Sequence, residues 1–151
     1  MNIRIEAKKR KTFNELDEGD FFTIKTNKTN DIFIKIKTFV KDEKVYNCVN
    51  VNSGKFGLID RTIGVAKYEL FLDIAVNLSK YVPTVYVCEI PNGHIVMTDS
   101  SYCMVVRNGV GSCGALVNLC GGEVISNPLA GIRAVVDITD HITNFTAKEI
   151  D

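Results

Sequence analysis

Two short stretches decide the fold: Val49-Asn50-Val51-Asn52-Ser53-Gly54 and Val117-Asn118-Leu119-Cys120-Gly121-Gly122. Both begin with Val-Asn and end on glycine, and corresponding positions lie 68 residues apart, Asn50 with Asn118 and Gly54 with Gly122. Asparagine and glycine tolerate the positive φ of tight turns, so each stretch predicts the end of a strand and a hairpin turn. A shared hairpin at a constant offset favours a tandem duplication of one unit.

Apolar runs rich in Ile, Val, Phe and Tyr flank both hairpins, and turns rich in Asn, Gly, Asp and Pro separate them. Residues 21–25 and 32–40 precede the first hairpin, and residues 85–90, 94–98 and 102–106 precede the second. Such runs are typical of β-strands. About five strands in each copy predict a mostly β chain built from two small SH3-like or partly open β-barrel units. Neither unit alone buries much core, so we expect the copies to pack on each other.

One helix is expected between the copies. Residues 67–80 carry Leu70, Phe71, Ile74 and Leu78 at helical spacing, which predicts an amphipathic helix that links the two units. The expected organisation is therefore a first β unit over 1–70, a linking helix or connection over 71–83, a second β unit over 84–138 and a C-terminal tail over 139–151.

The composition is that of a globular protein, with 46% hydrophobic and 24% charged residues among 151. Eighteen Lys and Arg balance eighteen Asp and Glu overall, but residues 1–80 hold fifteen basic against eleven acidic residues, and residues 81–151 three against seven. Binding of duplex nucleic acid usually needs a basic excess, so we do not expect nucleic acid as a partner. The second unit has few charges for a solvent-exposed barrel, so we expect a homo-oligomer in which that unit is covered.

No apolar run approaches the roughly 20 residues that cross a bilayer, and the N-terminal residues lack the pattern of a signal peptide. The five cysteines form no C-x-x-C pair and lie mostly among apolar neighbours, as expected for reduced, buried thiols. A zinc site from Cys113, Cys120, His94 and His141 would match no known zinc spacing. We therefore expect a cytoplasmic protein with no membrane partner, no metal and no cofactor.

The stretch Gly109-Val110-Gly111-Ser112-Cys113-Gly114 matches the pattern G-x-G-x-x-G. A dinucleotide fingerprint needs a strand before this pattern and a helix after it. Residues 115–119 are stopped at once by two glycines and predict another strand, which excludes that fold. Two interpretations are left open: a flexible hairpin loop, or a loop whose backbone N–H groups bind an anion.

Three isolated arginines could complete such an anion site. Arg107 and Arg133 are the two arginines of the second unit, each beside an apolar residue, and Arg61 lies in the first unit. An arginine in this setting either pairs with a carboxylate or recognises a phosphate or an acidic partner. The candidate ligand-binding residues are Arg107, Asn108, Gly109, Gly111 and Ser112, with Arg61 or Arg133 contributed across a subunit interface.

No catalytic motif fits its context. His94 and the run Asp99-Ser100-Ser101 invite a hydrolase interpretation, but no serine lies in a G-x-S-x-G elbow. His141 lies in the expected tail, and two histidines without a dense acidic cluster leave little material for metal-assisted hydrolysis. We therefore expect that the protein is not an enzyme and assign no catalytic residue.

The pattern Phe13-x-x-Leu16-x-x-Gly19-Asp20-x-Phe22, followed by an alternating strand and Val49-Asn50-Val51-x-x-Gly54, resembles short accessory proteins of unassigned function from phages and prophages of low-GC bacteria. The resemblance covers the first unit well and the second only through residues 117–122. It implies a phage accessory protein that counters host defence in the bacterial cytoplasm, either by binding a host protein or by sequestering a nucleotide signal. It transfers no ligand-binding residue.

Three functions are therefore compared. The leading hypothesis is a non-enzymatic, phage-encoded binding protein that sequesters a small anionic ligand such as a signalling nucleotide. The first alternative is an inhibitor or adaptor that binds a host protein through the apolar second unit. The second alternative is a barrel that binds single-stranded nucleic acid through Phe21, Phe33, Phe39 and Lys35 or Lys37.

Overall fold

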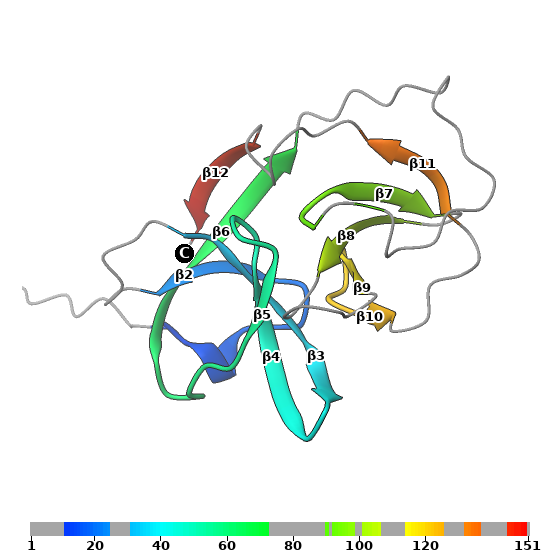
Figure 1. Cartoon of the computed structure of the whole chain (residues 1–151). Coiled ribbons are helices and arrows are strands. Elements are labelled where there is room, and N and C mark those ends of the chain that lie inside the picture. The colour runs from blue at the N-terminus through cyan, green and yellow to red at the C-terminus, as the bar shows by residue number, and fades with distance from the viewer. Residues whose placement is uncertain are drawn as a thin grey trace, which may run out of the picture.

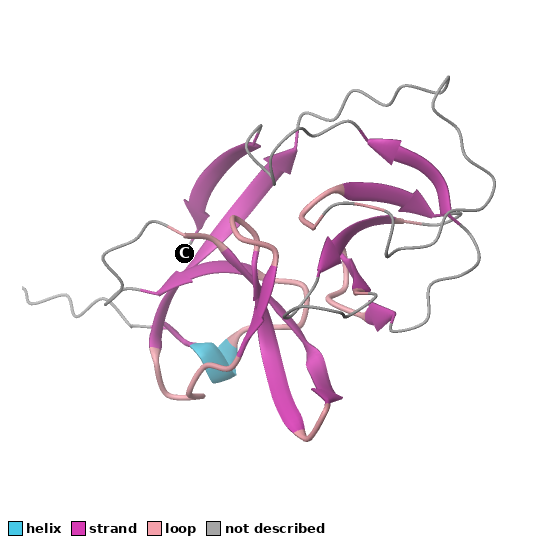
Figure 2. Cartoon of the chain, viewed as in Figure 1, coloured by secondary structure: helices cyan, strands magenta, loops and turns pink. Residues whose placement is uncertain are grey.

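The computed structural model describes residues 11–24, 31–72, 90, 92–98, 101–106, 114–125, 132–136 and 145–150. Over these ranges the chain is mostly β, as the sequence predicts, and its strands form two antiparallel sheets (Figure 1). One short 3-10 helix, η1 (Phe13–Glu15), lies below the curved strand β2 in Figure 2. Neither sheet closes into a barrel.

The first sheet has the strand order β1-β6-β2-β3-β4-β5, and β12 pairs with β6. Its strands are β1 (Lys11–Thr12), β2 (Phe21–Ile24), β3 (Phe33–Lys41), β4 (Lys44–Asn50), β5 (Lys55–Gly57), β6 (Gly64–Leu72) and β12 (Phe145–Ile150). The second sheet has the order β10-β9-β8-β7-β11. Its strands are β7 (Ile95–Thr98), β8 (Tyr102–Val106), β9 (Ala115–Asn118), β10 (Val124–Ile125) and β11 (Ile132–Val136).

The two sheets share one strand order and one register. Strands β6-β2-β3-β4-β5 of the first sheet correspond to β11-β7-β8-β9-β10 of the second, with every neighbouring pair antiparallel. The paired residues correspond as well: Val49 with Phe56 and Val117 with Val124, and Phe21 with Tyr68 and Ile95 with Val136. Each described position in these strands therefore has a counterpart in the other sheet.

The two predicted hairpin turns have the same hydrogen bonds. In each turn the asparagine side-chain oxygen accepts a hydrogen bond from the backbone N–H two residues later, at 2.9 Å for Asn50 and 2.8 Å for Asn118. The amides of Gly54 and Gly122 donate to the backbone oxygens of those asparagines, at 2.8 and 2.9 Å. Both glycines have positive φ, 67° and 69°, which only glycine adopts without strain.

The sheets pack on each other through a shared core, as expected for two small units. That core contains Ile34, Ile36, Val49, Val51, Ile95, Met104, Val106, Val117 and Leu119. Each sheet also has a core of its own on its other face. The first of these contains Phe13, Leu16, Phe22, Cys48 and Val65, and the second contains Ile90, Val96, Cys103, Val105 and Leu116.

The helix expected over residues 67–80 is wrong for its first part, because residues 67–72 belong to strand β6. A short apolar run fits either structure, and here β2 pairs with one side of β6 while β1 and β12 pair with the other. These three neighbours satisfy the backbone groups of β6 as ladder bonds instead of helical ones. Residues 73–80 lie outside the described part of the chain.

The C-terminal segment returns to the first sheet. Strand β12 pairs with β6 from Phe145 opposite Leu72 to Ile150 opposite Lys67. The expected tail over 139–151 therefore contains a strand, and the first sheet takes residues from both ends of the chain.

Candidate functional site

The described residues contain little of the anion site expected from the sequence. Arg107, Asn108, Gly109, Gly111 and Ser112 all lie outside them. Of the two remaining arginines, Arg61 lies in the loop before β6, and the backbone of Arg133 forms part of β11. Figure 1 places that loop and β11 at opposite ends of the molecule, so one chain does not bring Arg61 and Arg133 together.

Arg61 borders a cleft of about 970 Å³ on the first sheet. Four elements form the cleft: η1, β3, β4 and the loop over residues 58–63. Its apolar wall includes Val45, Leu58 and Ile59, and its charged or polar groups include Asn14, Glu18, Lys35, Asp60 and Arg61. This volume lies within the range of small-molecule sites in proteins.

The loop over residues 58–63 is held against β4 by one side chain. The Asn47 amide donates to the Ile59 oxygen at 2.8 Å, and the Ile59 N–H donates to the Asn47 side-chain oxygen at 2.9 Å. Asn47 thus replaces a strand partner at the point where β5 has ended. The wall of the cleft is consequently anchored to the sheet.

Asp60 stabilises the turn that follows. Its carboxylate accepts hydrogen bonds from the Thr62 N–H at 2.9 Å and from the Thr62 hydroxyl at 2.7 Å. Because these two bonds favour the ionised form, they lower the pKa of the Asp60 carboxyl below its ordinary value of 3.8. The carboxylate is therefore engaged within its own turn.

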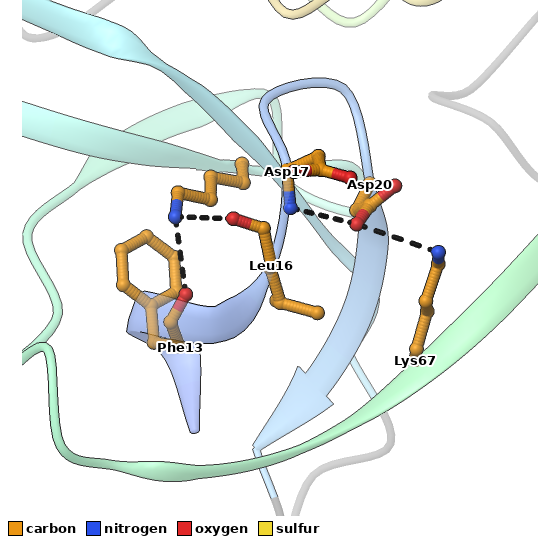
Figure 3. Close-up of polar contacts among 6 residues, drawn as sticks. Phe13, Leu16, Asp17, Asp20 and Lys67 are labelled. Carbon is orange, nitrogen blue, oxygen red and sulfur yellow. Dashed lines mark hydrogen bonds and ion pairs between the residues drawn. The ribbon is translucent and has the colours of Figure 1, made fainter. Parts of the chain in front are cut away.

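Lys35 lies at the inner edge of the cleft. Its ammonium donates to the backbone oxygens of Leu16, at 2.6 Å, and Phe13, at 3.1 Å, which Figure 3 shows around η1. The same nitrogen lies 4.7 Å from the centroid of the Phe13 ring, within the range of a cation–π contact. Lys35 is half-buried, and two of its three N–H donors are used by these carbonyls.

The counterpart of Lys35 in the second sheet is Val105, which is completely buried in that sheet's own core. The correspondence rests on backbone bonds to the preceding turn. Lys35 N–H donates to the Asp20 oxygen and its oxygen accepts from Gly19 N–H, at 2.9 and 2.7 Å; Val105 makes the same two bonds with His94 and Gly93, both at 2.8 Å. A lysine in the first sheet therefore occupies a position where the second sheet has a core valine.

The turn before β2 is held by acidic side chains. The Asp17 N–H donates to the Asp20 carboxylate at 2.8 Å, and Lys67 on β6 forms an ion pair with the same carboxylate at 3.5 Å (Figure 3). These contacts fix the segment whose carbonyl at Leu16 receives the Lys35 ammonium. Asp20 and Lys67 have a positioning role and do not line the cleft.

Arg61 is exposed, and its guanidinium has no hydrogen bond or ion pair to the part of the chain that the structure describes. Its backbone is fixed, because the Arg61 oxygen accepts the Asn14 N–H at 3.0 Å. A fixed backbone that carries a guanidinium without a carboxylate partner suits recognition of an anion.

The structure assigns other roles to the residues considered for nucleic-acid binding. Phe33 stacks on Phe22 with ring centroids 5.5 Å apart, and Phe39 packs on Phe56 at 5.1 Å. Phe21 and Phe39 pack against the core between the sheets. Faces committed in this way offer little surface for stacking bases. Lys37 forms an exposed ion pair with Glu123 at 3.4 Å.

The described cysteines differ in environment. Cys48 and Cys103 are buried, as expected, and burial raises the pKa of the Cys48 thiol to about 12. Cys120 is exposed, contrary to the expectation of burial. Within the described ranges, no group of three or more His, Cys, Asp and Glu side chains could hold a metal ion. No helix in those ranges is long and apolar enough to cross a membrane.

The candidate hydrolase residues are mostly outside the described chain, which omits Asp99, Ser100 and His141. His94 is described, and its backbone oxygen accepts the Val105 N–H at 2.8 Å, a structural contact within the second sheet.

Sequence reasoning missed Lys35 as a cleft residue, because alternation in residues 32–37 is typical of a strand with one solvated face. The signal that could have found it is internal: aligning the copies places this lysine opposite a valine. The scan against protein-family models finds no match, and no curated protein and no solved structure is significantly similar to the chain.

Proposed function

We propose that the chain is a binding protein for a small anionic ligand, and that the cleft of the first sheet is its site. The observation that carries the proposal is the position of Lys35. An ammonium group in a half-buried position costs free energy unless it is well paired, and the second sheet fills the equivalent position with valine. Arg61 adds an exposed guanidinium on the same cleft.

The ligand that fits this cleft combines an anionic group with an apolar or aromatic part. Val45 and Leu58, both on the cleft wall, expose 42% and 66% of their surface, which would cover a ring. Glu18 and Asp60 also line the cleft, so a ligand of modest charge fits better than a polyanion. A nucleotide with its base against Val45 and Leu58 and its phosphate near Arg61 and Lys35 meets these requirements.

Isothermal titration of the full chain against linear and cyclic nucleotides tests this proposal. Lys35→Met and Arg61→Gln should each weaken binding about tenfold or more, since a hydrogen bond between charged groups contributes about 1.5–3 kcal/mol. Lys55→Gln is the matched control, because Lys55 is exposed on β5 and does not line the cleft. Absence of heat with every nucleotide, or equal loss in Lys55→Gln, would contradict the proposal.

Arg107→Ala separates this cleft from the glycine-rich loop over residues 109–114. If Arg107→Ala abolishes nucleotide binding while Lys35→Met and Arg61→Gln leave it intact, the loop is the site and the cleft is not. With the cleft as the site, the stoichiometry should be one nucleotide per chain, because Val105 replaces the lysine in the second sheet.

We also propose that the two sheets descend from a tandem duplication of one small, SH3-like unit. The shared strand order, the matching register and the two identical asparagine–glycine turns support this proposal. The constant offset of 68 residues between the turns is expected of a duplication and has no basis in the physics of hairpins.

The biological setting is part of the same proposal. The resemblance of residues 13–54 to phage accessory proteins favours a role in the cytoplasm of an infected bacterium, where sequestering a signalling nucleotide would weaken host defence. Size-exclusion chromatography with light scattering would test the expected homo-oligomer.

An inhibitor that binds a host protein through the second unit is the alternative, and one observation favours it. Tyr102 and Ile125 expose 37% and 40% of their surface there. A host protein that co-elutes at one-to-one stoichiometry with the wild type, but not with Ile125→Asp, would favour this alternative over the nucleotide site.

A further inference from the structure

We infer that the two sheets meet through a reciprocal interface, of the kind that two copies of one unit form around a two-fold axis. The chain is in this sense an internal dimer. The inference concerns how the two units recognise each other and does not depend on the ligand proposed for the cleft.

The core between the sheets carries the first part of the argument. Its residues occupy equivalent positions in the two sheets, as shown by the register of β3 with β4 and of β8 with β9. Three such pairs are Ile34 with Met104, Ile36 with Val106, and Val49 with Val117. Both units therefore use the same face to contact each other, whereas units stacked by translation would use opposite faces.

The hairpin turns carry the second part. The turn that ends at Gly122 packs on the turn at Gly19: a Cβ added to Gly122 would lie 2.8 Å from the Gly19 nitrogen and 2.5 Å from the Lys35 oxygen. The Lys37 N–H also donates to the Gly122 oxygen at 3.0 Å. The second unit thus uses its asparagine–glycine hairpin to contact the glycine turn of the first.

The reverse contact is present as well. A Cβ added to Gly54 would lie 2.7 Å from the Asn92 side-chain nitrogen, and that amide donates to the Ser53 oxygen at 2.9 Å. Asn92 and Gly93 form the counterpart of the turn at Gly19, since both turns bond to equivalent residues of β3 and β8. Hairpin meets turn in both directions, which is the property of an isologous contact.

This geometry also explains a feature of the sequence. The second unit has few charged residues, and one whole face of it is covered by the equivalent face of the first unit. The surface that one unit needs is therefore the surface of a second copy of itself.

Thermal unfolding of the full chain tests the inference. Gly54→Ala and Gly122→Ala should each lower the unfolding midpoint by about 4 °C or more, in one cooperative transition. Gly64→Ala and Gly121→Ala are the matched controls, because a Cβ at either position meets nothing within 4 Å, and they should shift the midpoint by less than about 2 °C.

Backbone strain from positive φ would also lower the midpoint, so a second variant separates strain from contact. Asn92→Gly removes the amide that a Cβ at Gly54 would meet. Measured in that background, Gly54→Ala should cost less than in the wild type, while Gly122→Ala should cost the same. Equal costs of Gly54→Ala in both backgrounds, control-like behaviour of either glycine, or two separate transitions would overturn the inference.

Discussion

Replacing Lys35 with methionine is the sharpest perturbation of the first unit, because it removes the ammonium and keeps a side chain of similar length. The oxygens of Phe13 and Leu16 then lose the donors that lie 3.1 and 2.6 Å away. Leaving a buried acceptor without a partner costs about 1–3 kcal/mol, and the cation–π contact with the Phe13 ring contributes about 0.5–1 kcal/mol more at an exposed site. Relief of the half-buried charge opposes these losses. We expect a net destabilisation of about 2 kcal/mol from these terms.

Urea denaturation followed by circular dichroism measures this change, since the chain contains no tryptophan. With a slope of about 2 kcal/mol per molar urea, the midpoint should fall by about 1 M. Lys37→Met is the matched control on the same strand, because Lys37 is exposed and forms only a surface ion pair with Glu123. That control should change the stability by less than about 0.5 kcal/mol. Equal shifts in the two variants would refute the structural role assigned to Lys35.

Three further predictions concern single positions. Asp42 and Glu43 form the β3–β4 turn with φ of 52° and 64°, and Glu43→Gly should stabilise the protein by about 1 kcal/mol because glycine adopts positive φ without strain; Glu43→Ala keeps the strain, and an equal gain there would contradict the explanation. Mass spectrometry after iodoacetamide treatment at pH 8 should find Cys120 alkylated and Cys48 intact in the native protein, since Cys120 is exposed and burial raises the pKa of the Cys48 thiol to about 12; alkylation of Cys48 without denaturant would show that the first core is open. Thr62 lowers the pKa of the Asp60 carboxyl, so Asp60 stabilises the fold above about pH 4, and this contribution is lost as the pH falls through the depressed folded value. Urea midpoints for Asp60→Asn and the wild type should therefore differ near neutral pH and converge in acid, and a constant difference down to pH 2 would count against the Thr62 contacts.

The hairpins show how far local chemistry extends. The Asn50 and Asn118 turns follow from residue types alone, because the hydrogen bonds that define each turn join residues at most four positions apart. Helix and strand are not distinguished in the same way over residues 67–72. There the answer depends on β2 and on β12, whose residue Phe145 pairs with Leu72 from the far end of the chain.

The candidate site shows a similar division. Arg61 could be named from the sequence as an isolated arginine, but its cleft could not, because the loop that carries it is anchored by Asn47 on β4 and by Asn14 in η1. Lys35 alternates with Ile34 and Ile36, which favours an exposed lysine. Its half-buried position depends on Phe13 and Leu16, which lie about twenty residues earlier in the chain.

The sequence by itself determined that this chain is mostly β and that it carries the same turn twice at an offset of 68 residues. Turn chemistry and strand propensity act over a few residues, so they can be recognised without a structure. Only the tertiary structure decided that β6 is a strand, that the two sheets share one core and that a lysine of the first sheet stands where the second has a buried valine. These outcomes depend on packing between segments that are distant in sequence, and the burial of a side chain is defined only after those segments have met.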